Sequence, residues 1–179
     1  SAFYQARRLK TLDLPGVRTI EADAFTETIF EETYENLWKA GEFTGIVYAG
    51  NVAYLYFGPY TGASGGREYT PAKMPENTSI TLRDGTLGIS EFCFASHYVD
   101  SDSCKRNLKA ITVPNSLAYI PDGLFDGYVL DMYGFETSYA EDYAKRYDNI
   151  TFHPIRLPEK PVETYDWYDK AQGGVYELA

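Results

Sequence analysis

The side chains that could carry out chemistry are few in this sequence. It has two histidines, His97 and His153, and two cysteines, Cys93 and Cys104. Cys93 and His97 are four residues apart, a spacing that on a helix could let them share a metal ion. Zinc would need two further ligands, and no Cys-x-x-Cys or His-x-x-x-His pattern accompanies them. We therefore expect no metal site and no cofactor.

Two other patterns match the sequence motif of a ligand-binding loop only in part. Asp100 and Asp102 have the spacing of a calcium loop, but Lys105 and Ile111 stand where that loop requires Gly and Glu. The glycines between residues 62 and 66 lack the Gly-Lys-Ser/Thr ending that cradles a phosphate. The many carboxylates would allow a glycosidase pair by count alone, but no spacing brings two of them together. We expect no catalytic residue.

Composition indicates one folded body with an acidic surface. The chain has 179 residues, of which 44% are hydrophobic, and a formal net charge of −10. Nucleic acids and anionic membranes bind clustered Lys and Arg, so we expect neither as a partner. The sequence has no run of about 20 apolar residues, and we expect no direct membrane insertion in this segment. The 17 tyrosines suit both a thin core and an exposed binding face.

The framework for these residues is a repeated pattern of apolar positions. Copies occupy residues 9–25, 80–94 and 108–125, and each ends in phenylalanine. Repetition at a fixed spacing predicts a solenoid, whose units bury their apolar sides on one another. Three unrelated strands of an ordinary sheet are the alternative, which the matching offsets disfavour. In the second and third copies Leu82, Thr86, Ile89, Cys93 and Phe94 correspond to Val113, Leu117, Ile120, Leu124 and Phe125.

Each copy is expected to begin with a very short strand. Leu12-x-Leu14 and Ile111-x-Val113 alternate as strands with one buried face do. Pro15 and Pro114 then end those strands, because proline cannot donate the next ladder hydrogen bond. The pattern predicts parallel strands on one side of the solenoid and helical or irregular connections on the other.

Further elements are predicted between the first and second copies. Residues 28–40 have the pattern of a helix, with a Thr28-x-x-Glu31 capping box and a stop at Gly41. Residues 44–57 alternate as a β-hairpin that turns at 49–51, and residues 58–73 form an irregular, Gly-rich loop. The helical periodicity places Phe30, Tyr34, Leu37 and Trp38 on the buried face and Glu31, Glu35 and Lys39 toward water.

The C-terminal part of the chain has the pattern of a cap. Ser138-x-x-Glu141 is a second capping box, and it precedes a helix with one apolar face. Asn149-Ile-Thr-Phe152 predicts a closing strand. Such a cap covers the apolar end of the last repeat. Residues 156–179 are rich in proline and polar aromatic residues, as in a linker or tail.

The clearest copy carries a family resemblance. Leu108-Lys-Ala-Ile-Thr-Val-Pro-Asn-Ser-Leu-Ala-Tyr-Ile-Pro-Asp-Gly-Leu-Phe resembles the BspA-type leucine-rich repeat of bacterial and protist surface proteins. Residues 74–89 resemble a variant of that unit, and residues 132–152 resemble the family's cap. The resemblance covers roughly residues 1–25 and 74–155. It departs at Cys93 and Leu124, where the family usually has alanine.

The resemblance implies an α/β repeat fold, a right-handed leucine-rich repeat solenoid with short parallel strands, a β-hairpin insertion and a C-terminal helix-strand cap. Ala2-Phe3 matches the ending of a unit, so we expect the chain to be a segment of a longer protein. The expected boundaries are a solenoid over residues 1–155, with units near 1–25, 26–73, 74–106 and 107–127 and a cap over 128–155, followed by a linker or tail over 156–179.

The same resemblance implies a non-catalytic protein-binding or adhesion module of a secreted or cell-surface protein, with an extracellular protein or glycan as partner. A structural spacer that presents a neighbouring module is one alternative. A carbohydrate-active enzyme is the other, and it would need two carboxylates facing each other across a cleft at ~5–10 Å. Outward-facing strand residues are expected to form the binding face: Lys10, Asp13, Thr81, Arg83, Lys109 and Thr112.

The two cysteines leave one question open. Cys93 occupies a small buried position before phenylalanine, and the family often has a buried cysteine where Cys104 stands. Both are expected to pack as small apolar groups in the core. A disulfide between them is the alternative, and it would add roughly 3 kcal/mol of stability.

Overall fold

The computed structural model describes residues 2–21, 24–62 and 70–156, which form a mixed α/β fold. A four-stranded, all-parallel sheet and a smaller mixed sheet lie along the molecule. The helices are α1 (Ile29–Lys39), α2 (Ser101–Asn107) and α3 (Tyr139–Ala144). The strands are β1 (Gly45–Ala49), β2 (Val52–Phe57), β3 (Thr78–Thr81), β4 (Gly88–Ile89), β5 (Leu108–Thr112), β6 (Leu130–Phe135) and β7 (Ile150–Ile155).

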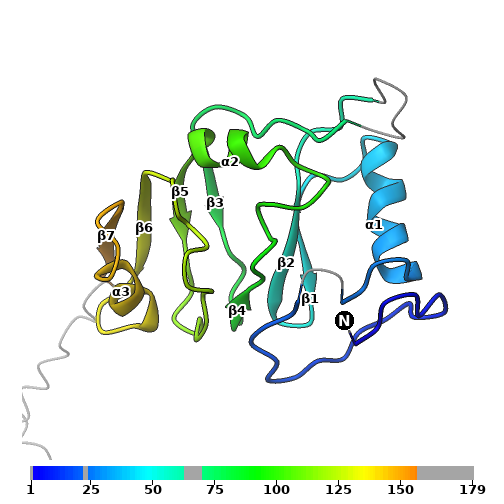
Figure 1. Cartoon of the computed structure of the whole chain (residues 1–179). Coiled ribbons are helices and arrows are strands. Elements are labelled where there is room, and N and C mark those ends of the chain that lie inside the picture. Colours follow the sequence, from blue (N-terminus) through cyan, green and yellow to red (C-terminus); the bar gives the residue numbers. More distant parts are fainter. Residues whose placement is uncertain (1, 22–23, 63–69, 157–179) are drawn as a thin grey trace, which may run out of the picture.

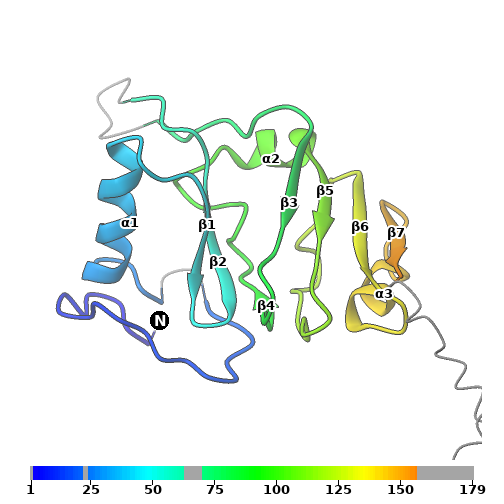
Figure 2. The same cartoon turned by 180° about the vertical axis from the view of Figure 1, so that it is seen from behind.

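The elements follow one another along the molecule nearly in sequence order. The parallel sheet has the strand order β3-β5-β6-β7, and the mixed sheet has the order β1-β2-β4. Helix α1 and the β1–β2 hairpin lie at one end, and α3 and β7 lie at the other (Figure 1). The reverse view shows the same succession (Figure 2). The expectation of short parallel strands is confirmed for the four strands from β3 to β7.

Helix α1 forms where the sequence predicts it. The Thr28 hydroxyl oxygen accepts a hydrogen bond from the Glu31 amide at 3.3 Å, and the chain leaves the helix at Gly41, whose φ is +72°. The predicted helix faces are wrong in two places. Glu31 is buried, and Leu37 lies at the surface. Glu31 can turn inward because the Tyr98 hydroxyl supplies a hydrogen-bond partner there, at 3.0 Å.

The predicted hairpin is confirmed, but its second strand is more enclosed than the alternating pattern indicated. β1 and β2 pair antiparallel around a turn at Gly50, and all six residues of β2 are buried. Tyr54 and Phe57 join an apolar core that includes Trp38 of α1, whereas Tyr56 joins the core of the parallel sheet. β2 therefore stands between two cores.

The parallel sheet has the alternation that the sequence predicts. Strands β3, β5, β6 and β7 are in register, and one row of side chains faces a common apolar core. Burying one such side chain stabilises the fold by roughly 1.5–3 kcal/mol. The residues one step away along each strand must point outward, because side chains alternate between the two faces of a sheet. The inward row consists of Ile80, Ile111, Met132 and Phe152.

Two segments of the fold repeat each other at a spacing of 31 residues. The backbone hydrogen bonds that form the turns of the second predicted copy recur at the matching positions of the third copy. The buried rings of Phe94 and Phe125, which end the two copies, lie 6.1 Å apart. The matching amide-to-carbonyl bonds are Thr86 to Arg83 and Leu117 to Pro114, Cys93 to Ser90 and Leu124 to Pro121, and Ala95 to Phe92 and Asp126 to Gly123.

The first predicted copy differs. A strand is expected at Leu12-x-Leu14, but the structure has none there. The segment instead lies against the mixed sheet: Leu14 approaches Gly50, and a Cβ on Gly88 would lie 1.7 Å from the Arg18 carbonyl oxygen. β4 already pairs with β2 on one side and with Tyr119 on the other. The first segment pairs with neither sheet, so the prediction of a strand at Leu12-x-Leu14 is wrong.

The ending of the first copy is nevertheless packed as expected. Phe25 is buried, and its ring stacks on that of Phe3 with the centroids 5.6 Å apart. The Phe3 amide donates to the Ala24 carbonyl at 3.1 Å. The phenylalanine position is therefore filled in the same way in all three copies, although the first lacks its strand.

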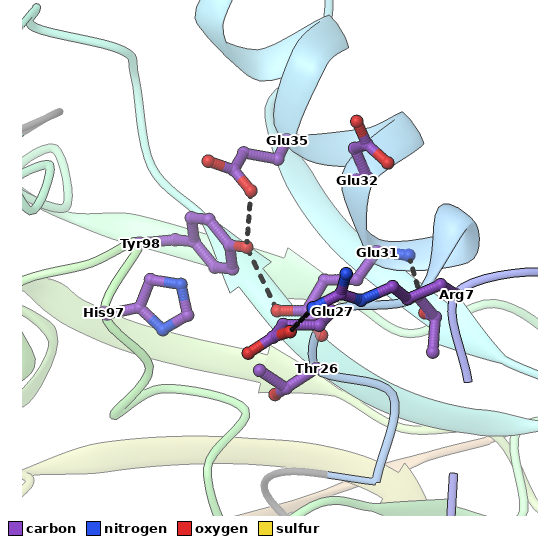
Figure 3. A pocket seen from close by; sticks show the side chains of 9 residues that line it. Arg7, Thr26, Glu27, Glu31, Glu32, Glu35, His97 and Tyr98 are labelled. Carbon is purple, nitrogen blue, oxygen red and sulfur yellow. Dashed lines mark hydrogen bonds and ion pairs between the residues drawn. The ribbon is translucent and has the colours of Figure 1, made fainter. Parts of the chain in front are cut away.

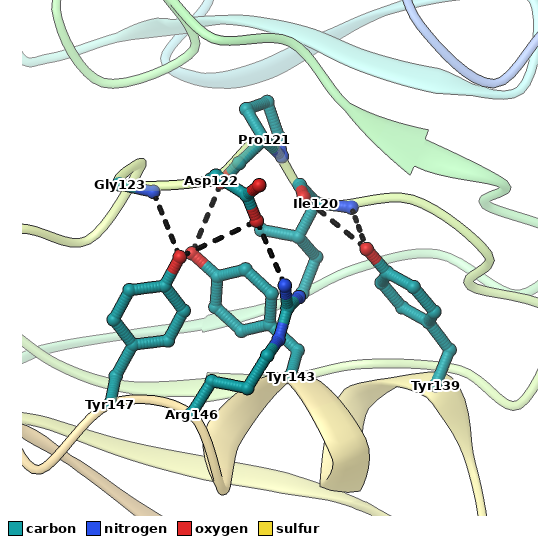
Figure 4. A network of polar contacts seen from close by, with 8 residues as sticks. All are labelled: Ile120, Pro121, Asp122, Gly123, Tyr139, Tyr143, Arg146 and Tyr147. Carbon is teal, nitrogen blue, oxygen red and sulfur yellow. Dashed lines mark hydrogen bonds and ion pairs between the residues drawn. The ribbon is translucent and has the colours of Figure 1, made fainter.

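The helix and the strand of the predicted cap are both present, as α3 and β7. Three tyrosine hydroxyls on and after α3 reach the turn at residues 120–123 (Figure 4). They satisfy backbone groups there that have no strand partner. Arg146 adds an ion pair with Asp122 at 2.9 Å. The tyrosine contacts are Ile120 amide to Tyr139 at 3.3 Å, Tyr143 to the Pro121 carbonyl at 3.1 Å, and Gly123 amide to Tyr147 at 3.1 Å.

Helix α2 was not predicted, and it explains the Asp100-x-Asp102 pattern. The Asp100 carboxylate accepts hydrogen bonds from the amides of Asp102 at 3.0 Å and Ser103 at 3.4 Å. Asp100 is therefore the N-cap of a helix. In the described ranges no helix is long and apolar enough to cross a bilayer. Of the predicted loop and tail, residues 63–69 and 157–179 lie outside the described residues.

Candidate functional site

The outward face of the parallel sheet carries a row of polar and aromatic side chains. The strand register places Thr81 beside Thr112, Thr112 beside Tyr133, and Tyr133 beside His153. Neighbouring strands lie about 4.8 Å apart, so these four residues form a continuous line. We refer to Thr81, Thr112, Tyr133 and His153 as the sheet row. The two predicted residues Thr81 and Thr112 are thus brought together.

The aromatic end of the sheet row is held in place by its own contacts. The rings of Tyr133 and His153 stack, with centroids 4.7 Å apart and planes 18° from parallel. His153 Nε2 lies 2.7 Å from Asp131 Oδ1, and the two side chains are 40% and 49% exposed. The imidazole is therefore fixed on one face and at one edge while it remains open to solvent. Fixed side chains lose less conformational entropy when a partner binds.

The His153–Asp131 pair is suited to binding more than to proton transfer. A histidine held by a carboxylate is a general base in many enzymes, but it works in an enclosed site beside a nucleophile and oxyanion donors. Here both groups are about half exposed on an open sheet face. Their donors and acceptors, with the Thr112 and Tyr133 hydroxyls, are placed to meet the polar groups of a partner that lies on the sheet.

The remaining residues of the predicted face lie elsewhere. Lys109 is exposed at a β-bulge, because the register skips it between the pairs Thr78–Leu108 and Ser79–Ala110. Arg83 is also exposed, but its guanidinium lies 4.1 Å from the centre of the Tyr48 ring and bonds to the Gly50 carbonyl. That contact joins β3 to the hairpin.

Lys10 and Asp13 are exposed in the first segment, which contributes no strand to either sheet. The structure therefore does not bring them to the sheet row. Their expected position depended on the strand at Leu12-x-Leu14, and without that strand no register aligns them with Thr81.

Sequence reasoning missed half of the sheet row and its carboxylate. Asp131, Tyr133 and His153 lie in the segments that the sequence pattern predicts as a cap, which would cover the sheet rather than continue it. A signal was present in the alternation around Met132 and Phe152, the inward positions of β6 and β7. Extending the strand register into the cap would have placed these residues on the outward face.

A second feature is an acidic cleft of about 370 Å³ between α1, the segment before it and the turn that ends at Tyr98. The Tyr98 hydroxyl lies 3.0 Å from Glu31 Oε1 and 3.4 Å from Glu35 Oε2. Arg7 forms an ion pair with Glu27 at 3.3 Å. Figure 3 shows the carboxylates of Glu31 and Glu35 directed toward the Tyr98 hydroxyl, with His97 beside the Tyr98 ring. No local sequence pattern indicates this cleft, because its residues lie up to 91 positions apart.

Glu31 and Glu35 do not have the arrangement that the carbohydrate-enzyme alternative requires of a carboxylate pair. Glu31 and Glu35 are one helical turn apart on the same element and share one tyrosine hydroxyl. A glycosidase pair flanks the scissile bond from two sides. Across the cleft from α1 stand Tyr98 and His97 (Figure 3), so these two carboxylates line one wall.

The cysteines lie in the core and take no part in either surface. Cys93 and Cys104 are free, and both are fully buried. Burial raises the pKa of the Cys93 thiol, and burial followed by the charge of Asp100 raises the pKa of Cys104 to about 12. Neither thiol is therefore an activated nucleophile. Among the described residues no group of three or more His, Cys, Asp and Glu side chains could hold a metal ion.

The chain matches no protein-family model, no curated protein and no solved structure.

Proposed function

We propose that the chain is a right-handed, BspA-type leucine-rich repeat solenoid whose outer sheet face binds an extracellular protein or glycan. The solenoid part of the proposal is supported by the recurrence of the same backbone turns at a 31-residue spacing. It is also supported by the stacked phenylalanines and by the four parallel strands. In such a fold each unit contacts only its neighbours, which leaves one sheet face open along the whole stack.

The observation that carries the binding role is the sheet row. Its four residues are aligned by the strand register, and two of them are aromatic rings that contact each other. Partly exposed aromatic groups contribute much of the free energy at binding interfaces. A side chain that only covered the sheet would have no need of the Asp131 contact that orients His153.

We propose that this module is non-catalytic and lies outside the cell or on its surface. The acidic net charge of −10 argues against nucleic acid and anionic lipid as the partner. The exposed pair His153–Asp131 offers hydrogen bonds rather than an enclosed reaction site. A spacer that presents another module would need no such oriented surface, and it is the outcome to expect if the sheet row has no effect on binding.

The experiment is a binding screen of the purified chain against arrays of extracellular-matrix proteins and of glycans. The variant Tyr133→Ala, with His153→Ala as a second, removes the aromatic end of the sheet row. Glu91→Ala is the matched control, because Glu91 is exposed in the turn after β4 and lies outside the parallel sheet. The proposal expects retained ligands to lose binding with both aromatic variants and to keep it with Glu91→Ala. A screen without any ligand, or equal binding by all variants, would favour the spacer.

The size of the effect can be stated in advance. Truncation of a central aromatic residue at an interface typically costs more than about 1 kcal/mol, and about 1.4 kcal/mol is a tenfold change in Kd. We therefore expect each aromatic variant to weaken binding by about five- to tenfold or more. Both rings stand outside the core, so the far-UV circular dichroism spectrum should be unchanged.

A further inference from the structure

Two asparagines of the chain stand in the pattern Asn-x-Ser/Thr. They are Asn77-Thr78-Ser79, immediately before β3, and Asn149-Ile150-Thr151, immediately before β7. This pattern is the acceptor for N-linked glycosylation in secreted proteins. Both asparagines lie at the same end of the parallel sheet, since β3 and β7 run in the same direction. Their side chains, however, are in opposite situations.

The Asn77 side chain is available for modification. Asn77 is exposed in a turn and has a φ of +57°, a left-handed conformation that asparagine tolerates well. Its side-chain amide makes no hydrogen bond to any residue that the structure describes. The turn is stabilised without it, because the Thr78 hydroxyl donates to the Pro75 carbonyl at 2.6 Å. Ser79, the hydroxyl residue of the pattern, is exposed as well.

The Asn149 side chain makes hydrogen bonds that hold two segments of the fold together. Its Nδ2 donates one hydrogen bond to the Phe125 carbonyl at 2.8 Å and another to the Tyr128 carbonyl at 3.0 Å. Both N–H bonds of the amide are therefore in use. A sugar on Nδ2 would replace one of these hydrogens, remove one of the two hydrogen bonds, and introduce bulk into a partly buried site.

We propose that Asn77 is an N-linked glycosylation site and that Asn149 is not. The reaction joins Asn77 Nδ2 to C1 of a sugar, with a lipid-pyrophosphate-linked oligosaccharide as the donor. The bond between C1 and the phosphate oxygen breaks, the lipid pyrophosphate leaves with the electron pair, and one Nδ2 proton passes to a base of the transferring enzyme. The inference rests on the proposed secreted location, because the donor and its enzyme meet the chain only on the secretory route.

A glycan at Asn77 would leave the sheet row accessible. Thr81 is four residues further along β3, which corresponds to roughly 13 Å at the rise of a strand. The sugar would leave from the strand-start end and from the β3 edge, whereas Tyr133 and His153 lie on the two strands at the other side of the sheet. Modification and binding are thus expected to coexist on one molecule.

The test is expression of the full chain behind a secretion leader in a eukaryotic cell line, with the intact mass of the secreted protein measured before and after an N-glycan-removing endoglycosidase. Ser79→Ala removes the Asn77 pattern and keeps the asparagine itself. Thr151→Ala removes the Asn149 pattern and leaves the two Asn149 side-chain hydrogen bonds in place. Ser79 and Thr151 are both exposed, so both variants should fold, and peptide mapping then assigns the modified residue.

We expect the wild type and Thr151→Ala to carry one glycan, at Asn77, and Ser79→Ala to carry none. An unmodified Asn77 in the secreted wild type, or a glycan on Asn149, would overturn the proposal. The mass measurement needs no ligand, so its failure is distinguishable from failure of the binding role. A chain that is not glycosylated but binds through the sheet row would refute only the present inference.

Discussion

The stacked phenylalanines allow a quantitative test of the packing between successive units. Phe94 and Phe125 are 1% and 2% exposed, and their rings are 6.1 Å apart with planes inclined by 37°. Replacing a buried phenylalanine by alanine costs about 3–5 kcal/mol. We expect Phe94→Ala and Phe125→Ala each to lower the free energy of unfolding by that amount, because the two positions are equivalent in consecutive units.

Phe92 is the matched control, since it is the same residue type in the same turn but is 39% exposed. Phe92→Ala should cost less than about 1 kcal/mol, as surface substitutions do. Urea unfolding monitored by circular dichroism gives the free energy of unfolding of the three variants. The values can be compared when the slope of that free energy against urea concentration is the same in each variant. A cost for Phe92→Ala as large as that of the buried pair would refute the reasoning.

The contact between the two rings can be measured separately. A domain of this size is stable by about 5–15 kcal/mol, so a double alanine variant could unfold, and the cycle is better made with Phe94→Leu and Phe125→Leu. An aromatic pair contributes about 0.5–1.5 kcal/mol beyond the area it buries. We expect a coupling energy in that range. Additive costs, with no coupling, would show that the rings do not interact across units.

Three further predictions concern other parts of the fold. Gly88→Ala should lower the free energy of unfolding, measured by urea unfolding, by about 1–3 kcal/mol or more. The alanine Cβ would lie 1.7 Å from the Arg18 carbonyl oxygen of the first segment, so the backbone would have to move. The bond to Lys145 is the main cause that lowers the pKa of Glu141. The stabilisation contributed by the Glu141 carboxylate is therefore complete above its unfolded-state pKa and is lost as pH falls through its lower folded-state pKa. Glu141→Gln should then flatten the acid side of the curve of stability against pH, measured by thermal unfolding. Cys93 and Cys104 should resist alkylation at pH 8 in the native protein, because burial raises the pKa of both thiols. In urea, mass spectrometry should show two alkyl adducts on the unfolded chain. Alkylation of either cysteine in the native protein would contradict this prediction.

The elements that depend on local pattern could be predicted from the sequence. The helix after Thr28, the hairpin around Gly50 and the helix after Ser138 each carry their own start, stop or turn residues. The apolar positions shared by the second and third copies are buried, with Leu124 partly so. These features follow from capping, turn geometry and periodicity, which act over a few residues.

The features that the sequence could not specify depend on tertiary neighbours. Leu12-x-Leu14 has the alternation of a strand, but the segment lies against Gly50 and Gly88 of the mixed sheet and pairs with no strand. Glu31 lies on the polar side of the helical pattern and is buried because of Tyr98, 67 residues further along the chain. Local pattern holds no information about either partner.

The proposed binding face was predictable in part for the same reason. Alternation alone points Thr81 and Thr112 outward, and the register confirms that they are neighbours. Tyr133 and His153 also alternate, but only the pairing of β6 with β5 and β7 shows that the sheet continues into the cap. Outward residues of the last two strands of the parallel sheet therefore belong with those of β3 and β5 in the proposed binding face.

The most direct test of the proposed binding role is an NMR titration of the isotopically labelled chain with a ligand retained in the array screen. The account predicts that the largest chemical-shift changes fall on the amides of the sheet row, Thr81, Thr112, Tyr133 and His153, and that Tyr133→Ala needs about five- to tenfold more ligand or higher to produce them. Changes centred on the acidic cleft around Tyr98, with the sheet row unaffected, would contradict it.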